Sequence, residues 1–95
     1  MESNYLKIIN HFGVNNQQRK LQEEVFELQE AITKYENGTG PILDIEEELV
    51  DVVILLHQFM EYYNLDGLNM MVHDKVKVER TLERIESGYY EANTR

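Results

Sequence analysis

The sequence predicts an all-α fold, a four-helix antiparallel bundle in which residues 1–95 form a single domain. Apolar residues recur every three or four positions through most of the chain, as they do along one face of a helix. Segments that contain glycine and asparagine, at residues 13–16, 37–41 and 64–67, interrupt this pattern three times. The four stretches between them are joined by short connections, which favour antiparallel neighbours.

The first two stretches predict a short helix at residues 2–12 and a long amphipathic helix at residues 17–35. Gly13 is expected to end the first helix, and Asn15 and Asn16 to cap the second. The apolar residues of the second helix step by four, three, four and three positions. They predict its buried face: Leu21, Val25, Leu28, Ile32 and Tyr35.

Residues 45–63 predict a central helix that is apolar on nearly every side. Asp44 followed by Glu47 resembles a capping box at its start. The arc expected to face the core consists of Leu49, Val52, Val53, Leu56, Phe59 and Met60. The remaining side is also apolar, with Val50, Ile54 and Leu55. Soluble monomers seldom expose such a stripe, so we expect a homo-oligomer, either a dimer or a dimer of dimers.

Residues 68–85 predict the fourth helix, which Ser87 and Gly88 are expected to end. Its apolar residues are Leu68, Met71, Val72, Val78, Leu82 and Ile85. Lys75 falls on the same face, where a cation is costly unless it points into an acidic or phosphate-filled cleft. Lys75 is therefore a candidate phosphate-binding residue.

Composition argues against several classes of function. The formal net charge of −9 disfavours sequence-independent binding of nucleic acid, because such binding neutralises phosphates with Lys and Arg. The chain has no cysteine, so it forms neither disulfides nor thiolate metal sites, and we expect a reducing cytoplasm. No signal-peptide pattern and no apolar run of the ~20 residues that a membrane span needs is present, so no membrane partner is expected.

Asp51 is unusual because it lies inside the apolar central helix, where an ionised carboxylate is costly unless a cation or hydrogen-bond donors meet it. Glu48 precedes it by one turn on the same face. Glu24 and Glu27 have the same relation beside the apolar face of the second helix. If the two helices pack side by side, four carboxylates converge. A hard divalent cation, Mg²⁺ or Mn²⁺, would then neutralise their repulsion.

These two acidic pairs resemble the signature of the MazG-type all-α nucleotide pyrophosphohydrolases, which is E-x-x-E followed later by E-x-x-D. The first half is EVFE, from Glu24 to Glu27, and the second is ELVD, from Glu48 to Asp51, with 20 residues between them. The wider resemblance covers roughly residues 11–90 and includes a later Lys-x-x-Arg.

The resemblance implies hydrolysis of a nucleoside triphosphate between its α and β phosphates, which gives a nucleoside monophosphate and pyrophosphate and removes non-standard nucleotides. The catalytic, magnesium-binding residues would be the four acids of the two motifs, Glu24, Glu27, Glu48 and Asp51. Glu27 is the candidate for orienting the attacking water. Lys77 and Arg80, the Lys-x-x-Arg pair, would contact the phosphates together with Lys75. No residue is assigned to the base.

Two alternatives stay open. A related enzyme of the same superfamily would act on dUTP or on phosphoribosyl-ATP, and the sequence does not distinguish these substrates. A catalytically idle helical module for dimerisation or regulation would have the fold without the chemistry, and the presence of all four acids argues against it.

Overall fold

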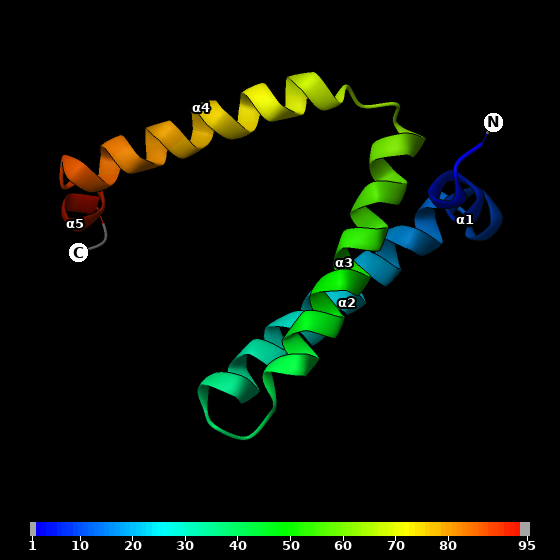
Figure 1. Cartoon of the computed structure of the whole chain (residues 1–95), viewed down its shortest axis with the longest axis horizontal. Helices are drawn as coiled ribbons and strands as arrows, with labels where there is room; N and C mark the ends of the chain where they lie inside the picture. Colours follow the sequence, from blue (N-terminus) through cyan, green and yellow to red (C-terminus); the bar gives the residue numbers. More distant parts are fainter. Residues whose placement is uncertain (1, 94–95) are drawn as a thin grey trace. The chain divides into compact units, whose positions relative to one another are not determined.

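The computed structural model describes residues 2–93, and within this range it contains helices and no strand. The helices are α1 (Asn4–Phe12), α2 (Val14–Glu36), α3 (Ile42–Tyr62), α4 (Gly67–Glu86) and α5 (Tyr89–Asn93), as Figure 1 shows. The all-α prediction is therefore confirmed. The chain divides into two compact units, Met1–Asn64 and Leu65–Arg95, each of which is described by itself.

In the first unit, α1 packs mainly on α3. Ser3 caps α1, because its side chain accepts a hydrogen bond of 3.1 Å from the backbone N–H of Leu6. The Ser3 hydroxyl also donates to the carboxylate of Glu61 on α3. The Tyr5 ring stacks on His57 with 4.9 Å between ring centroids, and Ile9 is fully buried. These contacts fix the short helix against α3.

Gly13 ends α1 as predicted, with a φ of 92° that favours glycine. The predicted caps of the second helix are wrong, because α2 begins at Val14 and both Asn15 and Asn16 lie inside it. Asn16 instead forms a hydrogen bond with the last residue of the preceding helix. Its side-chain amide donates a hydrogen bond of 2.7 Å to the carbonyl oxygen of Phe12, which is the last residue of α1.

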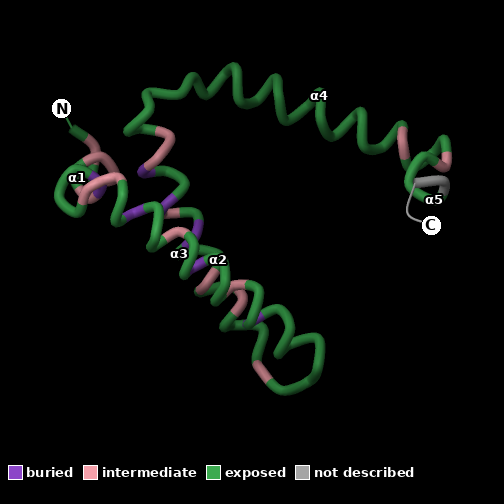
Figure 2. Tube along the Cα trace, turned by 180° about the vertical axis from the view of Figure 1, so that it is seen from behind, coloured by how far each residue is buried: buried purple, intermediate pink, exposed green. Residues whose placement is uncertain are grey.

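Helices α2 and α3 form an antiparallel hairpin with the largest contact in the first unit. In Figure 2, buried and half-buried positions follow each helix along its length. The buried or half-buried residues of α2 at this interface are Gln17, Leu21, Glu24, Leu28 and Ala31. Those of α3 are Ile45, Glu48, Val52, Leu55, Gln58 and Phe59. Apart from Phe59, which follows Gln58 directly, both sets step by three or four positions, as residues between two packed helices do. We call the two sets the hairpin interface.

The hairpin interface differs from the buried faces that the sequence predicts. On α2, Leu21 and Leu28 belong to it, but the other three predicted residues, Val25, Ile32 and Tyr35, are exposed. On α3, the predicted core residues Leu49, Val53 and Leu56 are exposed as well. Leu55, predicted for the outer stripe, is buried in the interface, whereas Ile54 is half-buried and Val50 exposed. Several interface positions carry polar residues, namely Gln17, Glu24 and Gln58. A buried face predicted from apolar residues alone is therefore rotated away from the observed one.

The turn between α2 and α3 contains the predicted helix breaker. Gly38 has a φ of 74° just after the end of α2, and Pro41 precedes the first residue of α3. The predicted capping box at Asp44 and Glu47 is wrong, because α3 begins at Ile42 and no side chain caps it. Asp44 lies in the first turn of α3, where a carboxylate interacts favourably with the helix dipole.

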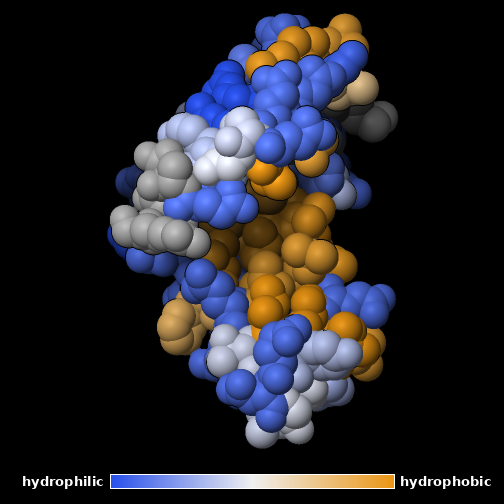
Figure 3. Space-filling view, turned by 90° about the vertical axis from the view of Figure 1, so that its left-hand side faces the viewer, coloured by the Kyte–Doolittle hydropathy of each residue, from blue (hydrophilic) through white to orange (hydrophobic). Residues whose placement is uncertain are grey.

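In the second unit, Asp66 caps α4 by accepting hydrogen bonds from the backbone N–H groups of Leu68 and Asn69. Ser87 and Gly88 end α4 as predicted, and the short helix α5 follows, which the sequence did not predict. The Arg84 guanidinium lies 4.8 Å from the centre of the Tyr89 ring. No residue of α4 is buried, and Leu68 is 73% exposed. The space-filling view of the whole chain in Figure 3 shows that apolar residues, in orange, also lie exposed on the face turned to the viewer.

Among the described residues, no helix combines the length and the apolar character that crossing a membrane requires.

Candidate metal centre

Three carboxylates converge where α2 and α3 pack together. Glu24 and Glu27 lie one turn apart on α2, and the antiparallel packing brings Glu48 of α3 next to them. Each of the three side chains offers an oxygen atom that lies within 4.8 Å of the others. This distance suits carboxylates that share one divalent cation. The structure thus brings together three of the four acids that the sequence predicts, and we call these three the acidic cluster.

Glu24 and Glu48 belong to the hairpin interface, and each has a carboxylate oxygen without a partner. Glu24 is only 6% exposed. Within the described residues, Oε2 of Glu24 and Oε2 of Glu48 are buried and accept no hydrogen bond. A buried oxygen without a donor is unfavourable in a native structure and calls for an explanation. A proton on Glu48 that is donated to Glu24 is one explanation, and a divalent cation held by the three carboxylates would be another.

The surroundings of Glu48 in the acidic cluster change its acidity. Burial raises the pKa of Glu48 from 4.5 to about 7. The charges of Glu27 and Glu24, and hydrogen bonds of the protonated Glu48 carboxyl with these two acids, act in the same direction. Near neutral pH the acidic cluster therefore holds a proton on Glu48 for part of the time. A divalent cation would displace this proton, since it stabilises the ionised carboxylate that the present surroundings disfavour.

Asp51 lies outside the acidic cluster and is exposed. The burial that its apolar neighbours predicted for Asp51 is found at Glu24 instead. Asp51 lines an open pocket of about 290 Å³, together with Glu24 and with Lys20 from α2. It follows Glu48 by one turn on α3, so it lies beside the acidic cluster at the wall of this pocket.

Lys20 is a residue of this site that the sequence analysis missed. Its ammonium nitrogen lies 3.0 Å from Oε1 of Glu24, and this contact raises the pKa of Lys20. Lys20 also lines a second open pocket, of about 500 Å³, between the end of α1 and the start of α2. The signal was present in the sequence, since Lys20 precedes Glu24 by one helical turn, which is the spacing of helical ion pairs.

Two buried amides close the hairpin interface on the same side as Lys20. The side chain of Gln17 donates a hydrogen bond of 2.8 Å to Oε1 of Gln58, which joins α2 to α3. Both residues also line the pocket that contains Lys20, Glu24 and Asp51. The pocket therefore has acids at one part of its wall and amides at another.

The predicted phosphate-binding residues belong to the second unit. Lys75, Lys77 and Arg80 lie on α4 and are exposed, so the side chains are accessible to a ligand. Their role stays a prediction. His57, which the sequence did not favour as a metal ligand, stacks on Tyr5 and is not part of the acidic cluster.

Comparisons of the chain with protein-family models, with curated proteins and with solved structures found no match.

The donor set of the acidic cluster fits magnesium or manganese. All three groups are carboxylates, which hard cations prefer, and two of them have buried oxygens without partners. Glu27 is exposed, so water and a substrate phosphate have access to one side of the cluster. Magnesium commonly keeps several such open positions for water and phosphate oxygens.

Proposed function

We propose that the chain is a magnesium-dependent nucleoside triphosphate pyrophosphohydrolase of the MazG type, acting in the cytoplasm on non-standard nucleotides. The observation that carries the proposal is the acidic cluster, in which Glu24 and Glu48 each keep a buried oxygen without a partner. Its members occupy three of the four acidic positions in the E-x-x-E and E-x-x-D motifs. Glutamates that only form a solvent-exposed helix face would show neither this convergence nor the burial of Glu24.

Glu24, Glu27 and Glu48 would hold the cation, with Asp51 as the fourth ligand from the adjoining pocket wall. A magnesium ion bound there would offset the charge of the triphosphate and lower the pKa of a bound water. Glu27 is the residue that we propose to orient the attacking water, because it is the exposed member of the acidic cluster.

We further propose that Lys75, Lys77 and Arg80 bind the substrate phosphates. Their exposure on α4 and their charge support this, in a chain whose net charge of −9 otherwise repels a triphosphate. The proposed assembly is a homo-oligomer, a dimer or a dimer of dimers, in which the helices form a four-helix antiparallel bundle. Many apolar residues exposed on α2, α3 and α4 support an assembled state.

The test is pyrophosphate release, measured over a panel of canonical and modified nucleoside triphosphates that includes dUTP, and nucleotide product analysis with phosphoribosyl-ATP. We expect Mg²⁺-dependent turnover of at least one of them and loss of at least about 10²-fold in Glu24→Gln. Glu30→Gln is the matched control, because Glu30 is an exposed acid of the same helix outside the acidic cluster. Turnover of dUTP or phosphoribosyl-ATP alone would favour the related enzymes. A folded protein with no turnover in the whole panel would favour the idle module.

A further inference from the structure

Lys20 and Glu24 form an ion pair in which the two partners differ greatly in burial. The Lys20 side chain is 53% exposed, whereas that of Glu24 is 8% exposed. The other ion pair on α2, between Lys34 and Glu30, has the same i, i+4 type of spacing but a longer distance of 3.5 Å, and both partners are half exposed. The pair of Lys20 and Glu24 therefore cannot be explained as an ordinary surface ion pair, because its carboxylate lies in the hairpin interface.

Lys20 satisfies only one of the two oxygens of Glu24. Oε1 meets the Lys20 ammonium group at 3.0 Å, and Oε2 stays buried without a partner. The ammonium group is thus an incomplete counter-ion for this carboxylate. A divalent cation held by Glu24, Glu27 and Glu48 carries twice the charge and would compete with Lys20 for the same carboxylate.

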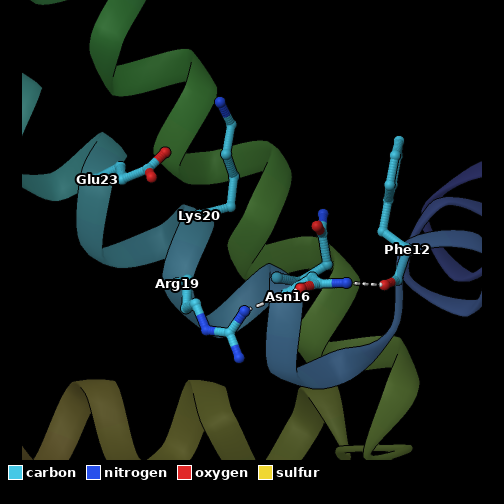
Figure 4. A pocket seen from close by; sticks show the side chains of 6 residues that line it. Phe12, Asn16, Arg19, Lys20 and Glu23 are labelled. Atoms are coloured by element: carbon cyan, nitrogen blue, oxygen red, sulfur yellow. Dashed lines mark hydrogen bonds between the residues drawn. The ribbon is translucent and has the colours of Figure 1, made fainter.

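The Lys20 side chain is able to leave Glu24 at little cost once another cation neutralises this carboxylate. It is a flexible chain with more than half of its surface exposed, and lysine holds its partner through a single point charge rather than a fixed fork. Lys20 also lines two open pockets. Asp51 lines one of them, and Phe12 and Asn16 line the other. In Figure 4, Lys20 extends toward α3, while Arg19 points toward Asn16 and donates a hydrogen bond to its side-chain oxygen.

We propose that Lys20 is a placeholder counter-ion, which neutralises Glu24 in the metal-free protein and moves to the phosphate groups of the substrate when a divalent cation occupies the acidic cluster. This inference rests on the proposed function. It adds a phosphate-binding residue from α2 to those expected on α4. It also explains how a buried carboxylate is tolerated before the cation arrives, since leaving it without any cation would be strongly unfavourable.

The first test follows the lysine side chains directly, in the wild-type protein and with magnesium alone. The chain has five lysines, so their ε-CH₂ signals in a ¹³C-labelled sample can be assigned by single substitutions. We expect the Lys20 signal to shift as Mg²⁺ is added and the Lys34 signal to stay. Equal responses of Lys20 and Lys34 at saturating Mg²⁺ would overturn the placeholder role.

The second test compares Lys20→Met with Lys34→Met, which removes the exposed ion pair of the same helix. We expect Lys20→Met to raise KM for the nucleoside triphosphate by about 10-fold, the effect of losing one charge-assisted phosphate contact, while the Mg²⁺ dissociation constant stays the same or falls. Lys34→Met should change neither. Lys20→Arg should have a KM between those of Lys20→Met and the wild type, because it restores the positive charge.

The two proposals fail in different ways. If Mg²⁺ shifts no signal and no triphosphate is hydrolysed, the metal centre and the placeholder role both fall. In another outcome, Mg²⁺ binds and the wild-type protein hydrolyses a triphosphate, but Lys20→Met and Lys34→Met have the same KM. Only the proposed role of Lys20 is then wrong. Because the first test uses the unaltered chain, it decides the question even if Lys20→Met does not fold.

Discussion

At the scale of single residues, Glu48 should make stability depend on pH between its unfolded and folded pKa values. Burial raises its pKa in the folded chain to about 7, above the 4.5 expected when unfolded, so the folded state binds the proton more tightly. This contribution to stability is fully present below pH 4.5 and is lost as the pH rises to about 7. We expect the melting temperature of metal-free protein, relative to Glu48→Gln, to fall between these two pH values.

Magnesium should remove this dependence, because a bound cation stabilises the ionised form of Glu48 and binds only the folded arrangement. The measurement is a series of thermal melts of both proteins with EDTA and with millimolar Mg²⁺. If wild type and Glu48→Gln show parallel pH profiles in EDTA, the carboxylates do not interact as the structure indicates.

Asp51 separates activity from stability most clearly, because it is exposed. Asp51→Asn keeps the size of the side chain and removes its charge. We expect turnover to fall at least about 10²-fold through weaker cation binding. The metal-free free energy of unfolding should change by less than about 0.5 kcal/mol, as is usual for exposed positions. Urea unfolding in EDTA and steady-state kinetics test the two parts. A variant that turns over at the wild-type rate would remove Asp51 from the site.

The sequence was sufficient to predict that Glu24, Glu27 and Glu48 converge, but not how they are buried. The two motifs, with spacings of one helical turn, place Glu24 and Glu27 on one helix and Glu48 on the other, and the structure brings these three together. Burial could not be predicted in the same way, because it depends on which faces of α2 and α3 meet. The spacing of Lys20 and Glu24 indicates their ion pair, but not the burial of Glu24 within it.

At the scale of helices, the hydrogen bond between Gln17 and Gln58 should fix how α2 and α3 align. Both side chains are buried, so Gln58→Leu would leave the amide of Gln17 without a partner. We expect this single variant to lose about 1–3 kcal/mol of the free energy of unfolding. The double variant Gln17→Leu/Gln58→Leu should recover most of the loss, because it replaces both polar groups.

Chemical denaturation of the two single variants and the double variant measures this coupling. Additive losses would show that the two amides act independently, and the hydrogen bond would then have no role in aligning the helices. Mg²⁺ should bind more weakly to the single variants if they shift Glu24 relative to Glu48.

The C-terminal ends of α1, α2 and α4 were easier to predict than the starts of the helices or their buried faces. Gly13, Gly38 and Gly88 adopt positive φ values next to helix ends, as their positions in the sequence indicate. The buried face of α2 was harder to predict, because Gln17 and Glu24 occupy interface positions where a periodicity of apolar residues cannot find them. The start of α3 was missed because Pro41, rather than an acidic side chain, precedes it.

At the scale of the whole molecule, we expect self-association. No residue of α4 is buried, and exposed apolar residues on the first unit include Phe26, Leu49 and Val50. Multi-angle light scattering at micromolar concentration should give a mass above that of the 11.3 kDa monomer. The melting temperature should also rise with protein concentration. A single monomeric species with a concentration-independent melt would contradict this expectation.

Glu24 and Glu48 stand at positions of the hairpin interface where an idealised pair of helices would carry leucine. We therefore expect a hairpin with leucine at these two positions to be more stable than the native one, and the proposed cation site would account for the difference. We expect Glu24→Leu/Glu48→Leu to melt at least about 4 °C above the metal-free wild type and to lose its response to Mg²⁺, which thermal melts would measure. A search for thermostable variants that scores packing alone would thus select the substitutions that abolish the proposed activity.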